Sequence, residues 1–151
     1  MAEKTIDIAS PILSRNERLA DQLRQRFNET NTYVINVLSS PGSGKTTTIL
    51  GTNERLRDKA GLRCAVIEGD IASDVDAITM KEAGMPAIQI NTGGLCHLEG
   101  NMIMEAVDAF DQAVGLQNID VIFIENVGNL VCPVDFDLGE NLSICLLYTS
   151  D

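Results

Sequence analysis

A glycine-rich turn between an apolar run and a helical segment constrains this sequence more than any other feature. Residues 39–47 have the sequence SSPGSGKTT. They follow the apolar, β-branched residues 33–38, which predict a buried strand, and they lead into residues 46–59, which predict a helix. A strand that enters a helix through Gly-x-Gly-Lys-Thr is the setting in which this pattern binds phosphate. The alternative is a flexible turn ahead of a helix, without a ligand.

The residue types of this turn suit a phosphate, because glycine adopts backbone angles closed to other residues and lets the chain approach an anion closely. Amide groups at the start of the helix then point at the anion, and the helix dipole adds a favourable potential. Lys45 is expected to reach the β- and γ-phosphate oxygens, and the Thr46 hydroxyl to take one position on Mg²⁺. Ser39 stands where the general pattern has its first glycine. The predicted nucleotide-binding residues of the turn are Gly42, Ser43, Gly44, Lys45, Thr46 and Thr47.

Strands and helices alternate along the rest of the chain. Further strands are predicted at residues 63–68, 86–90, 120–125 and 142–147, and further helices at 73–83 and 101–114. A capping box at Ser14 and Glu17 predicts that a leading helix begins at Ser14. The alternation predicts an α/β fold, with a parallel sheet and helices on both faces. We therefore expect a flexible N-terminus over 1–13, a partial P-loop NTPase domain over 14–142 and a tail over 143–151.

Composition narrows the class of partner. The chain has 151 residues, enough for one domain, and a formal net charge of −11. Nucleic acid and anionic membranes both attract basic surfaces, so neither is expected as a partner. No apolar run is long enough to span a membrane, and the first residues do not have the pattern of a signal peptide. The four cysteines form neither a C-x-x-C pair nor a dense framework, which favours a reducing, cytoplasmic setting.

Two carboxylates follow predicted strands and extend the nucleotide site. Ligands of a parallel α/β sheet bind outside the carboxyl ends of its strands. Asp70 and Glu125 each follow a strand that we expect to neighbour the strand before the glycine-rich turn. A carboxylate there holds Mg²⁺, with Asp70 the favoured ligand, or orients the water that attacks the γ-phosphate. The predicted catalytic residues are therefore Lys45, Asp70 and Glu125, and the alternative is a carboxylate that caps a helix or pairs with Lys45.

A cysteine and a histidine stand side by side in a glycine-rich loop, and a third residue is expected on the same edge of the sheet. Cys96 and His97 follow the third predicted strand, and Cys132 follows the fourth. Thiolate and imidazole ligands favour Zn²⁺ or Ni²⁺ over Mg²⁺ or Ca²⁺. Three ligands leave a site incomplete, and a twofold dimer could complete it by supplying the same groups again. The alternatives are an ordinary surface or core histidine and inert cysteines.

Residues 125–128 (Glu-Asn-Val-Gly) have the form of a second nucleotide-sensing loop. The amide of Gly128 is expected to bond the γ-phosphate and to release it after hydrolysis. Cys132 follows four residues later on the same segment. A loop that contacts the γ-phosphate and carries a metal ligand would couple the nucleotide state to metal affinity.

Taken together, these segments resemble the nickel-incorporation GTPases that mature nickel–iron hydrogenases, the hydrogenase maturation accessory protein B family, which is related to the urease accessory GTPases. The segments that carry the resemblance are residues 39–47, 69–70 with Asp76, 91–98 (NTGGLCHL), 123–133 (FIENVGNLVCP) and 136–140 (FDLGE). The resemblance implies a SIMIBI-type P-loop GTPase that uses GTP and Mg²⁺ and forms a homodimer with GTP bound. It also implies that Cys96, His97 and Cys132 hold Ni²⁺ or Zn²⁺, and that nickel passes to the hydrogenase large-subunit precursor with a partner maturation protein.

The chain departs from this family pattern in three places. It has neither an N-terminal cysteine site nor a histidine-rich tract, so nickel storage is not expected. It lacks the N-K-x-D motif that selects guanine, and residues 143–151 fit the family poorly, so we expect a chain truncated after about Glu140 with impaired activity. The alternatives are a P-loop kinase for a small molecule, a urease-type nickel GTPase, and a metal-binding module with an idle phosphate loop.

Overall fold

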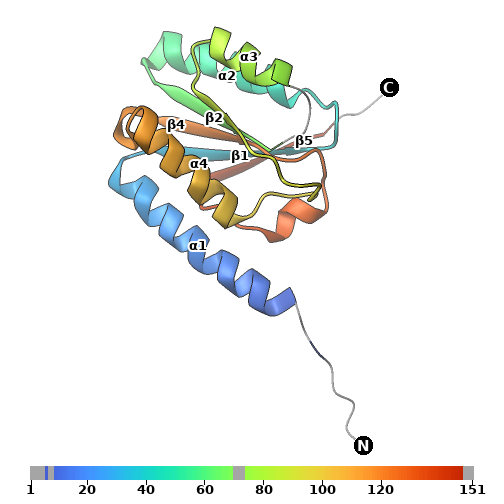
Figure 1. The fold of residues 1–151 in the computed structure, drawn as a ribbon. Coiled ribbons are helices and arrows are strands. Elements are labelled where there is room, and N and C mark those ends of the chain that lie inside the picture. The colour runs from blue at the N-terminus through green and yellow to red at the C-terminus, as the bar shows by residue number, and fades with distance from the viewer. Residues whose placement is uncertain (1–5, 7–8, 70–73, 148–151) are drawn as a thin grey trace, which may run out of the picture.

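The computed structural model describes residue 6 and residues 9–69 and 74–147, and a parallel five-stranded sheet lies at the centre of this part of the chain (Figure 1). The order of the strands across the sheet is β3-β2-β4-β1-β5, and each described pairing is parallel. The strands are β1 Tyr33–Ser39, β2 Cys64–Glu68, β3 Ala87–Gln89, β4 Val121–Glu125 and β5 Leu142–Leu146. The predicted α/β architecture is confirmed, including the fifth strand.

Strand β4 takes the central position, between β1 and β2. It pairs with β1 on one side and with β2 on the other, so that Glu125 lies level with both Val37 and Glu68. The prediction that the strands before Asp70 and Glu125 both neighbour β1 is therefore right for β4 and wrong for β2. All five residues of β4 are buried, as expected for an apolar strand covered on both faces.

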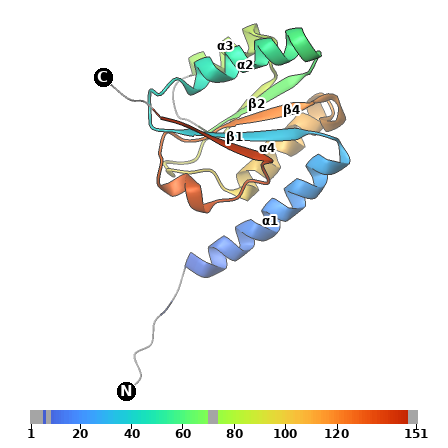
Figure 2. The ribbon, with the colours of Figure 1, turned by 180° about the vertical axis from the view of Figure 1, so that it is seen from behind.

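Helices cover both faces of the sheet (Figures 1 and 2). Helices α1 Ala9–Glu29 and α4 Gly100–Ala113 pack on one face, and α2 Lys45–Ala60 and α3 Asp74–Glu82 pack on the other. Leu23 and Phe27 of α1 share one core cluster with Phe110 of α4. Ile49 of α2 and Met80 of α3 belong to the other. Two short 3-10 helices, η1 Leu116–Asn118 and η2 Cys132–Asp135, flank β4 in the chain.

Helix α1 begins five residues earlier than the capping pattern predicts. It starts at Ala9, so Ser14 lies inside the helix rather than at its cap, and residues 9–13 are helical. Pro11 falls in the first turn, where its missing N–H has no helical partner to lose. A permissive first turn thus lets the helix extend past the local capping signal. No helix in the part of the chain that the structure describes is long and apolar enough to cross a membrane.

Candidate functional site

The glycine-rich turn joins β1 to α2 as the sequence predicts. Gly42 and Gly44 have φ angles of 75° and 86°, in the left-handed region that favours glycine, and Gly44 is the residue that precedes α2. The Ser40 and Ser43 hydroxyls lie 2.8 Å apart, and the Ser43 hydroxyl also donates to the Ser40 carbonyl at 2.9 Å. The turn is therefore held by its own serines, with the first amides of α2 at its end.

The Thr46 hydroxyl and the Glu125 carboxylate meet beside this turn. Thr46 Oγ1 donates to Glu125 Oε1 at 3.0 Å, and Lys45 is 4% exposed. Glu125 is buried, and among the described residues its Oε2 has no hydrogen-bond partner. A buried carboxylate oxygen without a partner is costly unless a cation or a water satisfies it. The oxygens of Thr46 and Glu125 therefore fit the Mg²⁺ that the nucleotide site implies. Asp70, the favoured magnesium ligand, lies outside the described residues.

A second buried carboxylate, Glu68, lies at the same edge and was missed by the sequence analysis. Glu68 ends β2, is 2% exposed, and lies opposite Glu125 in the register of β2 and β4. The available signal was a charged residue at the carboxyl end of an otherwise apolar strand. Its position beside Glu125 depends on the strand order, which the sequence did not reveal.

The segment after β4 lies directly on the glycine-rich turn. A Cβ atom added to Gly128 would stand 3.0 Å from Pro41 Cγ and 3.1 Å from Pro41 Cα. The Asn126 amide donates to the Val37 carbonyl at 3.1 Å, and its side-chain nitrogen donates to Asn36 Oδ1 at 3.1 Å. Residues 125–128 are thus held against the turn by backbone and side-chain contacts, at the place predicted for a nucleotide-sensing loop.

Cys96, His97 and Cys132 converge at the same edge of the sheet. Cys96 Sγ and His97 Nδ1 lie 3.8 Å apart. Hydrogen bonding with Cys132, and then with His97, lowers the pKa of Cys96, whereas contact with Cys96 raises the pKa of Cys132. Deprotonation is therefore favoured at Cys96 first, and a thiolate is the form that binds a metal. As they stand, no three or more His, Cys, Asp or Glu side chains in the described ranges are arranged to hold a metal ion.

Three further residues hold this cluster, and the sequence analysis assigned a role to none of them. His97 Nε2 lies 3.0 Å from Glu99 Oε1, and the His97 ring stacks on Phe136 with centroids 4.0 Å apart. Asn129 Nδ2 donates to Cys132 Sγ at 3.7 Å. Burial lowers the pKa of His97, but hydrogen bonds with Cys96 and Glu99 outweigh it and raise that pKa. A carboxylate on one ring nitrogen commonly orients the other nitrogen toward a metal, which here is Nδ1.

Gly69 connects the cysteine–histidine loop to the nucleotide edge. Its amide donates to the Glu125 carbonyl at 2.8 Å, across the ends of β2 and β4. A Cβ atom at Gly69 would stand 2.6 Å from both methyl carbons of Leu98, the residue after His97. The glycine is needed because a buried leucine occupies the space where a side chain would start. The loop of Cys96 and His97 is therefore packed against the ends of β2 and β4.

These features define a P-loop nucleotide-binding domain with an α/β fold: a parallel sheet, a glycine-rich turn that opens a helix, and buried carboxylates at the same edge. Residues 33–142 match the family model described as CobW/HypB/UreG, nucleotide-binding domain. The chain belongs to this CobW/HypB/UreG family.

The chain is similar to several maturation factors. The hydrogenase/urease maturation factor HypB of Helicobacter hepaticus is 44% identical over 149 residues, which cover 99% of this chain and 60% of that protein. The hydrogenase maturation factor HypB of Escherichia coli strain K12 is 43% identical, over 98% of this chain and 49% of its own length. The crystal structure of HypB from Helicobacter pylori in complex with nickel superposes with a TM-score of 0.78 and 40% identity, over 87% of this chain and 59% of that one. The chain therefore spans about half to three-fifths of the length of these relatives.

Proposed function

We propose that this chain acts as the nucleotide- and metal-binding part of a GTP-hydrolysing nickel carrier for hydrogenase maturation. The observation that carries the proposal is the shared edge: the glycine-rich turn and the Cys96–His97–Cys132 cluster both lie at the carboxyl ends of the strands. Gly69 contacts Leu98, the residue after His97. Its amide donates to the carbonyl of Glu125, whose carboxylate accepts a hydrogen bond from the Thr46 hydroxyl. Similarity to HypB maturation factors, one of them crystallised with nickel, supports the metal and the pathway.

In the proposed mechanism the residues of the turn bind and orient the phosphates. The amides of Gly42, Gly44 and the first turn of α2 surround the anion, and Lys45 balances charge on the β- and γ-phosphates. Ser43, Thr47 and Gly128 complete the nucleotide contacts. Mg²⁺, when bound, neutralises phosphate charge, with Thr46 as its protein ligand together with Asp70.

Glu125 is the residue proposed to orient water or to steady the ion from the end of β4. Its Oε1 already accepts a hydrogen bond from the Thr46 hydroxyl, and its Oε2 is buried without a hydrogen-bond partner among the described residues. Hydrolysis is expected to be slow in the chain alone, because no arginine finger is identified among the residues that the structure describes. Slow hydrolysis suits a protein that uses the nucleotide as a switch.

Nickel is the proposed cargo, held by Cys96, His97 and Cys132, with Zn²⁺ as a competing ion. A homodimer formed with GTP would bring two such clusters together and complete the coordination of the ion. The proposed partners are another nickel-maturation protein and the hydrogenase large-subunit precursor, in the cytoplasm. Delivery to urease is a second candidate, favoured by the hydrogenase/urease name of one relative.

The decisive experiment measures nickel affinity of the chain by chelator competition, with Mg²⁺ and either GDP or a non-hydrolysable GTP analogue. We expect different affinities in the two nucleotide states, and loss of nickel binding in Cys96→Ser. Cys145→Ser is the matched control, because Cys145 is an exposed cysteine on β5. Equal nickel affinity in both nucleotide states contradicts the coupling, and unchanged binding in Cys96→Ser contradicts the metal site. Phosphate transfer to a small acceptor would instead support the kinase alternative.

A further inference from the structure

One side chain of α1 touches both of the loops that carry the proposed metal ligands. Asn16 is 5% exposed. Its Oδ1 accepts a hydrogen bond from the Gly100 amide at 2.6 Å, and its Nδ2 donates to the Asp137 carbonyl at 2.7 Å. Helix α1 precedes residues 33–142, the part of the chain that the family model matches. A buried side chain outside that match therefore connects two segments that lie within it.

Both contacts are made where these loops join the rest of the fold. Gly100 is the first residue of α4 and directly follows Glu99, whose carboxylate lies against His97. A Cβ at Gly100 would stand 3.0 Å from Asn16 Oδ1, so the approach is close. On the other side, Asp137 directly follows Phe136, the ring that stacks on His97.

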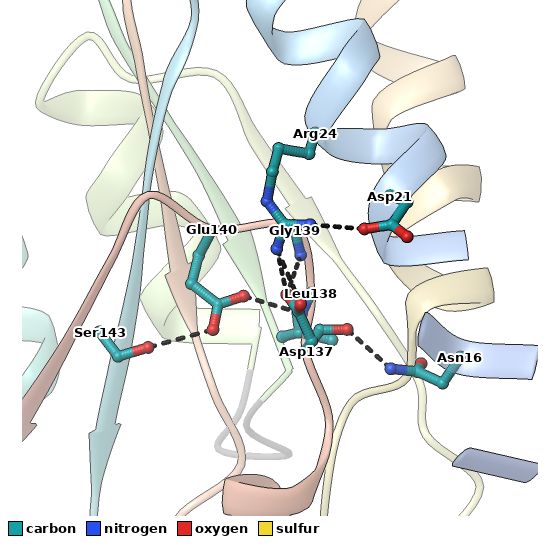
Figure 3. A network of polar contacts seen from close by, with 8 residues as sticks. All are labelled: Asn16, Asp21, Arg24, Asp137, Leu138, Gly139, Glu140 and Ser143. Atoms are coloured by element: carbon teal, nitrogen blue, oxygen red, sulfur yellow. Dashed lines mark hydrogen bonds and ion pairs between the residues drawn. The ribbon is translucent and has the colours of Figure 1, made fainter. Parts of the chain in front are cut away.

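The loop that follows Cys132 makes a second contact with α1, through Arg24 and Asp137 (Figure 3). Arg24 Nη2 donates to both oxygens of the Asp137 carboxylate, at 2.9 and 2.7 Å, and Arg24 Nη1 donates to Asp21 at 2.9 Å. The Gly139 amide donates to Asp137 Oδ1 at 2.8 Å. The Asp137 side chain is thus held by Arg24, and its backbone carbonyl is held by Asn16.

Asparagine suits this position because its amide has an acceptor oxygen and a donor nitrogen on one short, planar group. Aspartate would still accept from the Gly100 amide, but it has no hydrogen to offer the Asp137 carbonyl. An apolar side chain would satisfy neither buried backbone group. The residue type therefore matches a bridge between one amide and one carbonyl.

We propose that Asn16 is a positioning residue of the metal cluster: it fixes the loop of Cys96 and His97 relative to the loop of Cys132 and so sets the affinity for nickel. This inference rests on the proposed function, because it assigns a role at the same cluster. It gives α1 a function beyond packing, since the helix is the common frame to which both ligand-bearing loops are attached.

The test compares Asn16→Asp with wild type in the full chain. Nickel affinity is measured by chelator competition, the thiolate-to-nickel charge-transfer absorption is recorded, and thermal unfolding is followed without metal. We expect the aspartate to keep the start of α4 in place, and nickel binding to weaken by about tenfold, the lower end of what the loss of an outer-shell contact costs a metal site, with a weaker charge-transfer band. Arg24→Gln removes the ion pairs with Asp137 and Asp21 and leaves the Asn16 bridge in place, so it should weaken nickel binding in the same direction by about threefold.

Thr32→Val is the matched control for a merely structural effect. Thr32 is also buried, and its hydroxyl donates to the Ile119 carbonyl at 3.1 Å, but it precedes β1 at the opposite edge of the sheet. The Thr32→Val substitution should lower the unfolding temperature and leave nickel affinity unchanged. The inference about Asn16 is overturned, and the proposed metal site is not, if Asn16→Asp and Arg24→Gln both bind nickel like wild type. The same holds if Thr32→Val weakens nickel binding as much as they do. Unchanged nickel binding in Cys96→Ser overturns the proposed metal site and this inference with it.

Discussion

Replacing Gly128 with alanine should weaken nucleotide binding through a contact with the backbone of the phosphate loop. The new Cβ would stand 3.0 Å from Pro41 Cγ, 3.1 Å from its Cα and 3.2 Å from its nitrogen. Carbon atoms are at their optimum at about 3.5–4.0 Å, so the shortfall is about 0.5 Å or more. Because two of the three atoms are backbone, a side-chain rotation cannot relieve the clash, and the turn must move.

The size of the effect follows from the cost of overpacking, which is about 1–3 kcal/mol for one added group. Gly128 is outside the left-handed region, so alanine adds no backbone strain of its own. If about 1.4 kcal/mol of the cost has to be met when the turn closes on phosphate, nucleotide affinity falls about tenfold. Isothermal titration of GDP and of a GTP analogue measures this directly.

Gly51→Ala is the matched control for the same chemical change. Gly51 lies within α2, and a Cβ there would meet nothing within 4 Å. Alanine should stabilise the helix by up to about 1 kcal/mol and leave nucleotide affinity at the wild-type value. The reasoning is refuted if Gly128→Ala binds both nucleotides like wild type, or if Gly51→Ala weakens them equally.

Two further changes test the packing around the site. Gly69→Ala places a Cβ 2.6 Å from the methyl carbons of the fully buried Leu98. The free energy of unfolding in urea should therefore fall by about 1–3 kcal/mol, and nickel affinity should fall with it. An unchanged nickel titration would contradict the link between Gly69 and the loop of Cys96 and His97. Burial favours the neutral form of Asp137, but Arg24 and the Gly139 amide outweigh it and hold the pKa of Asp137 below its ordinary value. The resulting stability is present above about pH 4 and is lost as pH falls through the lowered pKa. Both side chains of the ion pair are about two-fifths exposed, so Asp137→Asn should cost only about 0.5–1 kcal/mol at pH 7. The cost should shrink as pH falls below about 4, and a difference in stability that does not change with pH in urea unfolding would contradict the assignment.

The local sequence was enough to predict the helices, the strands and the phosphate-binding turn. The backbone angles at Gly42 and Gly44 and the start of α2 follow from adjacent residues, so the pattern in the sequence carried them. The alternation of strands and helices gave the parallel sheet for the same reason. Because parallel strands end at one edge, the sequence also placed Lys45 and the Cys96–His97 pair at the same end of the sheet.

Tertiary structure alone decided which of these segments touch. The position of β4 between β1 and β2, and with it Glu68 opposite Glu125, depends on how the whole sheet packs. Asn16 bonds to Gly100 and to Asp137, which are 84 and 121 positions further along the chain. Helix α1 begins at Ala9 rather than at the predicted Ser14 because its first turn tolerates proline. Backbone preferences and the periodic spacing of apolar residues depend on a few neighbouring residues, so they can be predicted from the sequence. Strand order and side-chain contacts between distant segments are fixed only when all layers pack together.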